Sequence, residues 1–254
     1  MDDVVNLLAD KDLSTVYSSE YWNSIEDEKK KHWWIDDNGE LLIDFLNKSG
    51  LLDEYKSAES YIKQSKSSCL ISVADLAAGT GWTSAFISRL PEVGVIHAIE
   101  ISRHRLGELF EKTVKVLQGD PNKIKRYLGS FYDTKLGDAT IDVVILSQAF
   151  HHSDEPHLLL AEVSRILKNG GKALLIGEHF IGWKTFLKRC VSVLVRERRF
   201  TISFFDLFPP DSASEGGDHY YRVSDYFLMA KKFGFNISMQ KLKSKNVMYI
   251  LTKK

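Results

Sequence analysis

The sequence has few cysteines and no long apolar run. Only Cys69 and Cys190 are cysteines among 254 residues, which excludes a dense disulfide framework and suits a reducing compartment. Neither lies in a metal-ligand pattern, so no zinc site is expected. No segment approaches the roughly 18 apolar residues of a membrane-spanning helix, so no membrane span is expected.

An excess of charge and a targeting signal are also missing. The 34 basic residues equal the 34 acidic ones, so no global field attracts nucleic acid or an anionic membrane. A local basic patch is still compatible with this balance. The start, Met1-Asp2-Asp3, lacks the basic and apolar regions of a secretory signal. We therefore expect a cytoplasmic protein that binds no nucleic acid, with a homodimer left open.

The chain does contain a regular alternation of strand and helix patterns from residue 69 onward. The short apolar run Leu70–Leu76 ends at glycines, which is typical of a strand buried on both faces. Further strands are predicted over 95–100, 124–128, 141–146 and 173–177, and helices over 82–90, 106–117 and 155–167. This alternation predicts parallel strands joined by right-handed crossovers.

The two ends of the chain have different patterns. Residues 1–68 read as helical, and Asn169–Gly171 reads as a turn. A helix over 224–233 precedes strands 237–242 and 247–251, whose short separation predicts an antiparallel pair. The predicted fold is a doubly wound α/β fold with a mostly parallel seven-stranded sheet and one antiparallel strand. Its predicted parts are a helical cap (1–68), a cofactor-binding core (69–180), a lid insertion (181–222) and the end of the core (223–254).

A glycine-containing loop, Ala77–Gly81, lies between the first core strand and the following helix. Glycines there allow a sharp turn and close approach of a ligand to the main chain. Glu100 follows Gly81 by nineteen residues, at the end of the second strand, where a carboxylate can accept ribose hydroxyls. These features predict a nucleotide-like cofactor.

Two residues argue against a nicotinamide dinucleotide. That fingerprint needs glycine or alanine at position 84, and this chain has Ser84. Asp75, four residues before Gly79, would repel a pyrophosphate but suits a cationic amino acid moiety.

Five ordered segments resemble the motifs of the class I methyltransferases, over residues 70–180 and again from 218 to the end. They are Asp75–Gly81, Glu100, Gly129–Phe131, Ile141–His152 and Leu167–Lys172. The resemblance implies S-adenosylmethionine as cofactor and an aromatic N-terminal segment that covers it. The implied cofactor-binding residues are Tyr21, Asp75, Ala77, Gly79, Thr80, Gly81, Glu100, Ile101, Ser130, Phe131, Ser147 and Gln148.

Two histidines are candidates for catalysis. His151 follows the fourth core strand, where the resemblance places the acceptor beside the reactive methyl group. It could remove a proton from the acceptor, or it could fix the loop by hydrogen bonding. His219 lies where the predicted lid returns to the core. The lid's aromatic residues could shape a substrate pocket or simply pack on the core.

The sequence therefore predicts methyl transfer from S-adenosylmethionine to an oxygen, nitrogen or carbon nucleophile of a small molecule. No metal site is predicted, because no carboxylate cluster is evident. Two alternatives are a nicotinamide-dependent oxidoreductase and a scaffold that keeps the fold without turnover.

Overall fold

The computed structural model describes residues 4–7, 35–65, 69–197, 203–209, 217–242 and 246–254. Its centre is a sheet in the order β1-β4-β3-β2-β5-β6-β8-β7. The strands are β1 Val4–Asn6, β2 Ile71–Leu76, β3 Val93–Glu100, β4 Ile124–Leu128, β5 Ile141–Ser147, β6 Leu167–Ile176, β7 Phe235–Lys241 and β8 Val247–Lys253. Neighbours from β1 to β6 pair in parallel, and β8 pairs antiparallel with β6 and β7. The prediction of one antiparallel strand is confirmed.

The prediction of seven strands is wrong by one, because the sheet has eight. The extra strand is β1, in a segment predicted to be helical. Its three residues pair with Arg126–Leu128 of β4 and extend the sheet at that edge. Three residues are too few to show a strand period, so a tertiary contact decides the structure here.

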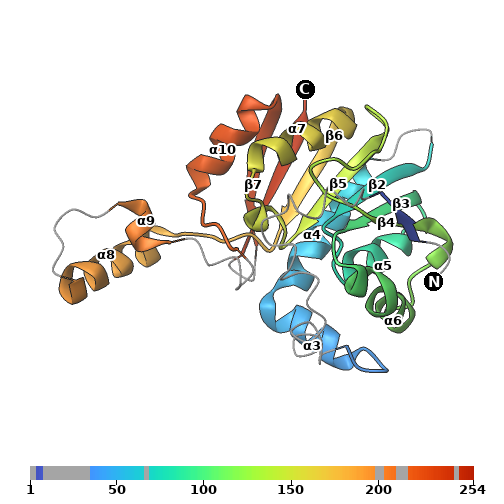
Figure 1. Ribbon diagram of the computed structural model, residues 1–254, viewed down its shortest axis with the longest axis horizontal. Coiled ribbons are helices and arrows are strands. Elements are labelled where there is room, and N and C mark those ends of the chain that lie inside the picture. Colours follow the sequence, from blue (N-terminus) through green and yellow to red (C-terminus); the bar gives the residue numbers. More distant parts are fainter. Residues whose placement is uncertain (1–3, 8–34, 66–68, 198–202, 210–216, 243–245) are drawn as a thin grey trace.

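Helices cover both faces of the sheet, which confirms the doubly wound architecture (Figure 1). One face packs against α3 Glu40–Ser49, α4 Leu51–Gln64, α5 Trp82–Ser88 and α6 Phe110–Val116. The other packs against α7 Pro156–Ile166 and α10 Val223–Lys232. Successive side chains of a strand point to opposite faces of the sheet. In β5, Val143 and Ile145 therefore enter the first core, whereas Val144 and Leu146 enter the second.

The predicted turn at Asn169–Gly171 is also wrong, since these residues lie within β6. The pairing register between β5 and β6 shifts at this point, and Gly170 has a φ of 77°. A glycine pair therefore marks an irregularity inside a strand rather than the end of one.

Residues 181–222 include an arm that stands out from the body of the molecule (Figure 1). It contains α8 Trp183–Glu197 and α9 Phe204–Leu207. None of the helices in the described part of the chain is long and apolar enough to cross a membrane. The division into cap, core and lid stays a prediction.

Candidate functional site

The loop between β2 and α5 turns through three residues with left-handed backbone conformation. Ala77, Gly79 and Gly81 have φ values of 54°, 56° and 82°. A Cβ atom at Gly81 would lie 2.4 Å from the ring of Phe110, so this position requires glycine. Ala77 adopts a conformation that costs an L-residue roughly 1–2 kcal/mol. Packing against α6 thus fixes the shape of the loop.

Glu100 connects this loop to the end of β3. Its Oε2 atom accepts the Gly79 N–H at 2.7 Å, and its Oε1 atom accepts the Ser102 N–H at 2.8 Å. Each carboxylate oxygen has a second lone pair, so the group can still accept hydroxyls from a ligand. The carboxylate is therefore held in place before any ligand binds.

Asp75 lies beneath the loop, fully buried. Its Oδ2 atom accepts the hydroxyls of Thr83 and Ser84, each at 2.6 Å. Burial raises the pKa of Asp75 to about 6, against the hydrogen bonds from Ser84 and Thr83. Ser84, which disagreed with the dinucleotide fingerprint, thus holds the acid near the end of β2.

A cavity of about 470 Å³ lies where β2 to β6 end. The predicted residues that line it are Ala77, Gly79, Thr80, Glu100, Ile101, Ser130, Phe131, Ser147, Gln148 and His151. Asp75, Gly81 and His219 are not part of its lining. Tyr21 lies outside the described residues. The structure therefore brings most of the predicted site together in one place.

Buried polar atoms near the cavity fit a cofactor with several hydrogen-bond donors. Asp75 Oδ1 and Ser147 Oγ have no hydrogen-bond partner within the described structure. Leaving such atoms unpaired costs about 1–3 kcal/mol each. Ser147 lines the cavity, so a hydroxyl or ammonium group of S-adenosylmethionine is the kind of donor that its Oγ atom needs.

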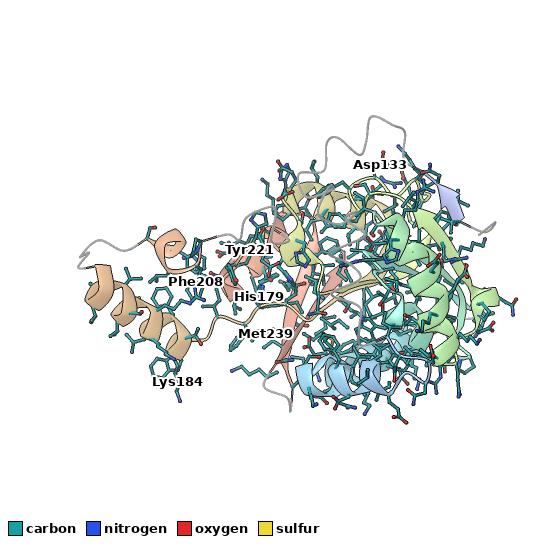
Figure 2. The ribbon with its side chains drawn as sticks, turned by 60° about the horizontal axis from the view of Figure 1, so that its bottom comes forward. Asp133, His179, Lys184, Phe208, Tyr221 and Met239 are labelled. Atoms are coloured by element: carbon teal, nitrogen blue, oxygen red, sulfur yellow. The ribbon has the colours of Figure 1, made fainter. Side chains whose placement is uncertain are left out.

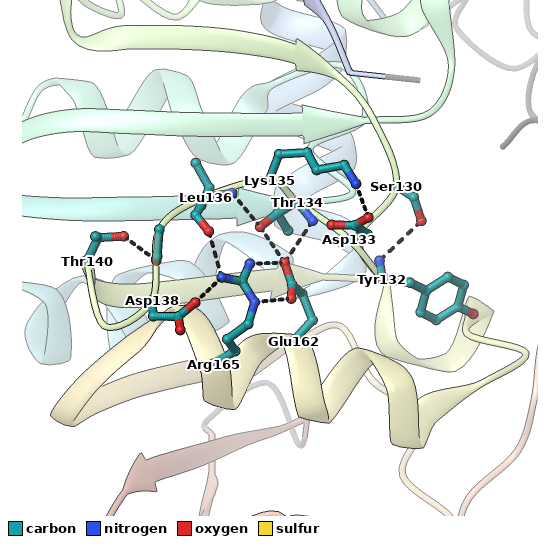
Figure 3. Close-up of polar contacts among 11 residues, drawn as sticks. Ser130, Tyr132, Asp133, Thr134, Lys135, Leu136, Asp138, Thr140, Glu162 and Arg165 are labelled. Carbon is teal, nitrogen blue, oxygen red and sulfur yellow. Dashed lines mark hydrogen bonds and ion pairs between the residues drawn. The ribbon is translucent and has the colours of Figure 1, made fainter. Parts of the chain in front are cut away.

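The loop after Ser130 and Phe131 is anchored to α7 by a polar network (Figure 3). Glu162 accepts the Thr134 N–H at 2.7 Å and two bonds from the Arg165 guanidinium, both at 2.8 Å. Arg165 also donates to the Leu136 carbonyl at 2.8 Å. This bidentate pair fixes the loop that forms one wall of the cavity.

At the opposite wall, His151 pairs with Glu178, which follows β6. Its Nδ1 atom lies 3.2 Å from Glu178 Oε2, and both side chains are buried. Glu178 also accepts the Phe150 N–H at 3.1 Å and the Tyr226 hydroxyl at 2.9 Å. Burial favours neutral His151, but the charge and hydrogen bond of Glu178, aided by Asp218, outweigh burial and raise the pKa of His151.

Asp218 connects two further histidines beside this pair. Its Oδ1 atom lies 2.9 Å from His152 Nδ1, and its Oδ2 atom lies 3.4 Å from His179 Nε2. Burial would raise the pKa of Asp218, but its close contacts with the rings of His152 and His179 lower it well below its usual range. His151, His152 and Asp218 each offer one ligand atom within 4.8 Å of the others, a spacing that could hold a metal ion.

His219 lies behind this cluster. Its backbone N–H donates to the His151 carbonyl at 2.8 Å, and its Nε2 atom lies 3.0 Å from Asp154 Oδ1. A row of aromatic rings runs nearby from the arm to the cavity. The successive centroid distances are 5.1 Å for Phe204–Phe208, 6.0 Å for Phe208–Tyr220, 4.8 Å for Tyr220–His179 and 4.5 Å for His179–His151.

Sequence reasoning missed Glu178, His179 and Asp218. A signal existed for the first two, because they directly follow β6 and ligands bind at the carboxyl ends of parallel strands. No local pattern points to Asp218, because its partners come from segments about 40 to 70 residues earlier in the chain.

Comparisons with known proteins agree with this geometry. Residues 74–175 match the family model described as a methyltransferase domain. Over 103 residues the chain is 36% identical to dimethylglycine N-methyltransferase of Parasynechococcus marenigrum (strain WH8102), a match that covers 39% of this chain. The chain thus spans only 34% of that relative's length.

Solved structures show the same fold at low sequence identity. The methyltransferase of Aquifex aeolicus described as SAM-dependent has a TM-score of 0.54 and 19% identity, covering 82% of this chain and 98% of that one. Geranyl diphosphate methyltransferase in complex with GPP and sinefungin has a TM-score of 0.56 and 12% identity, covering 78% of both chains.

The sheet order and the loop held by Glu100 define a Rossmann-like α/β fold with a cofactor cavity at its strand ends. With the match over residues 74–175, this part of the chain is a methyltransferase domain, and its fold is that of solved methyltransferases described as SAM-dependent.

Proposed function

We propose that the protein transfers the methyl group of S-adenosylmethionine to an oxygen, nitrogen or carbon nucleophile of a small molecule. The observation that carries this proposal is that one cavity contains both halves of such a site. Gly79 and Glu100 line one part, and His151 and Asp218 line the other. The similar structure described as a complex with GPP supports a small-molecule acceptor.

The first half would hold the cofactor. Glu100 would accept the ribose hydroxyls, the wall at Ser130 and Phe131 would border adenine, and Ser147 would accept a donor from the amino acid moiety. The bound cofactor supplies an activated methyl group, so the protein's task is to bind, align and desolvate the two reactants.

The second half would bind the acceptor and take its proton. Because Nδ1 of His151 pairs with Glu178, its Nε2 atom is the nitrogen that can accept a proton. The negative charge of Glu178 would stabilise the protonated ring. His219 would act as a positioning residue, since its N–H holds the His151 carbonyl and its side chain is not part of the cavity lining.

Transfer of label tests the function. The purified protein is incubated with methyl-labelled S-adenosylmethionine and small-molecule cell extracts, and the labelled product is identified. We expect label in one small molecule. Co-purified nicotinamide dinucleotide would instead indicate an oxidoreductase, and a site that binds no added S-adenosylmethionine would indicate a scaffold.

The balanced charge of the chain supports an acceptor other than nucleic acid, and the small number of cysteines supports a cytoplasmic location. Label in RNA or DNA would overturn the first of these proposals, and cell fractionation tests the second.

A further inference from the structure

Helix α8 is the main part of the arm, and only part of its surface is covered. One side faces α9 and the residue after it. Arg189 donates to the Leu207 carbonyl at 2.6 Å, and its guanidinium lies 4.5 Å from the centre of the Phe208 ring. The ring of Phe186 lies 6.5 Å from that of Phe208. Figure 2 labels Phe208 and, on α8, Lys184.

The neighbouring side of α8 is apolar and exposed. Trp183 is 72% exposed, Leu187 is 53% exposed and Val191 is 52% exposed. Together with the exposed Leu194 they stand at positions i, i+4, i+8 and i+11, which form one line along a helix. We call these four residues the apolar stripe. Exposed apolar side chains in such a line mark an interaction surface.

Basic residues border the stripe. From Trp183 to Val195 the helix contains three basic residues and no acidic one. At about 100° of rotation per residue, Lys184 and Lys188 lie beside the stripe, on the side away from Arg189. Both lysines are exposed. The surface therefore combines apolar contact with positive charge, although the chain as a whole is neutral.

We propose that the apolar stripe docks on an anionic membrane surface, with α8 lying in the plane of the lipid headgroups. Trp183 and the aliphatic side chains would enter the headgroup boundary, and Lys184 and Lys188 would contact lipid phosphates. A second copy of the chain fits this surface less well. Two such helices would bring their lysines together without any acidic partner between Trp183 and Val195.

Sedimentation with lipid vesicles tests the proposal. One vesicle set contains phosphatidylcholine with about 30% phosphatidylserine, and the other contains phosphatidylcholine alone. We expect the wild-type protein to pellet with the anionic vesicles and to be released by salt. The double variant Leu187→Glu/Val191→Glu should bind them at least about tenfold more weakly. Lys184→Glu/Lys188→Glu should lose the preference for anionic lipid.

A matched control uses apolar residues that are equally exposed elsewhere. Leu158 on α7 and Leu228 on α10 are 47% and 68% exposed, and Leu158→Glu/Leu228→Glu should bind the vesicles like the wild type. Unchanged affinity for S-adenosylmethionine would show that each variant is folded.

Three results would overturn the proposal. The first is a wild-type protein that stays in solution with anionic vesicles. The second is equal binding by the wild type and the stripe variant. The third is a lipid-free dimer of the wild type, seen by analytical ultracentrifugation, that the stripe variant loses, because the stripe would then bind a second copy.

Discussion

Glu100 holds the loop between β2 and α5 in place, and its carboxylate is also part of the proposed cofactor site. Its carboxylate accepts two backbone N–H groups, so the loop and the proposed ribose site share one side chain. The negative charge matters because hydrogen bonds to a charged group are worth about 1.5–3 kcal/mol.

We predict that Glu100→Ala weakens S-adenosylmethionine binding by roughly 10- to 100-fold, the equivalent of that energy. Isothermal calorimetry measures the affinity, at a temperature where the variant is shown to be folded. Glu108→Ala, at an exposed position on the following turn, is the control and should bind normally. Wild-type affinity in folded Glu100→Ala would remove Glu100 from the cofactor site.

His151 and Glu178 form a pair whose chemistry depends on pH. The carboxylate raises the pKa of His151, and only the neutral ring can accept a proton. We predict that the wild-type rate rises with pH through a pKa above 6.5, the ordinary histidine value. His151→Asn should lower turnover about 10²-fold or more and abolish this rise, with cofactor affinity unchanged.

Glu178→Gln supplies the test that separates a base from a structural residue. Removing the negative charge lowers the pKa of His151, so the rise in rate should move to lower pH. Chelators should leave the rate unchanged, because the proposed proton transfer from the acceptor to His151 uses no metal. A fully active His151→Asn would leave alignment alone to explain the reaction, and loss of rate on chelation, restored by a divalent ion, would indicate a metal at the histidine cluster.

At the scale of elements, the loop between β2 and α5 can be tested through its backbone. We predict that Gly81→Ala costs more than about 2 kcal/mol, because its Cβ would meet the Phe110 ring and its φ is 82°. Ala77→Gly should be neutral or stabilising by up to about 1 kcal/mol, since it relieves left-handed strain. Urea unfolding of both variants checks the two signs, and a harmless Gly81→Ala would contradict this account of the loop.

Helix α4 is joined to β6 by a buried acid. Glu54 accepts the Gly177 N–H at 2.6 Å and the Asn246 amide at 2.7 Å. Burial raises the pKa of Glu54 from 4.5 to about 7, against these two bonds. The protonated acid is therefore favoured in the folded state.

We predict that this contribution to stability is complete below pH 4.5 and is lost as pH rises to about 7. At about 1.4 kcal/mol per pKa unit, the loss is on the order of 1–3 kcal/mol. The free energy of unfolding of Glu54→Gln minus that of the wild type should therefore rise over this pH range. A flat difference would show that Glu54 has an ordinary pKa.

The elements that the sequence predicts well are those with a long repeat of buried residues. Strand β5 and helix α7 have such patterns, and their predicted ranges match the structure closely. Strand β1 and the glycines within β6 were missed because pairing with a neighbouring strand decides both. The secondary-structure preference of a short segment predicts its structure poorly where pairing with a neighbouring strand decides the outcome.

At the scale of the whole molecule, the cavity could be predicted because parallel strands place their carboxyl ends together. Glu100 and Ser147 end two such strands, so topology alone brings them to one edge. His151 could be predicted on the same ground, but Asp218 could not, because it meets His152 and His179 only through the fold. The lid role of the arm stays a prediction.

The row of rings from Phe204 to His151 has a mechanical consequence. Each ring contacts the next, so an unbroken row of packed side chains connects the arm with the wall of the cavity at His151. A surface that restrains the arm should therefore also restrain Tyr220 and His179. Fluorotyrosine at position 220 should show a shifted ¹⁹F resonance when anionic vesicles are added, but not in Leu187→Glu/Val191→Glu. An unchanged resonance in vesicle-bound wild type would show that the arm moves independently of the cavity.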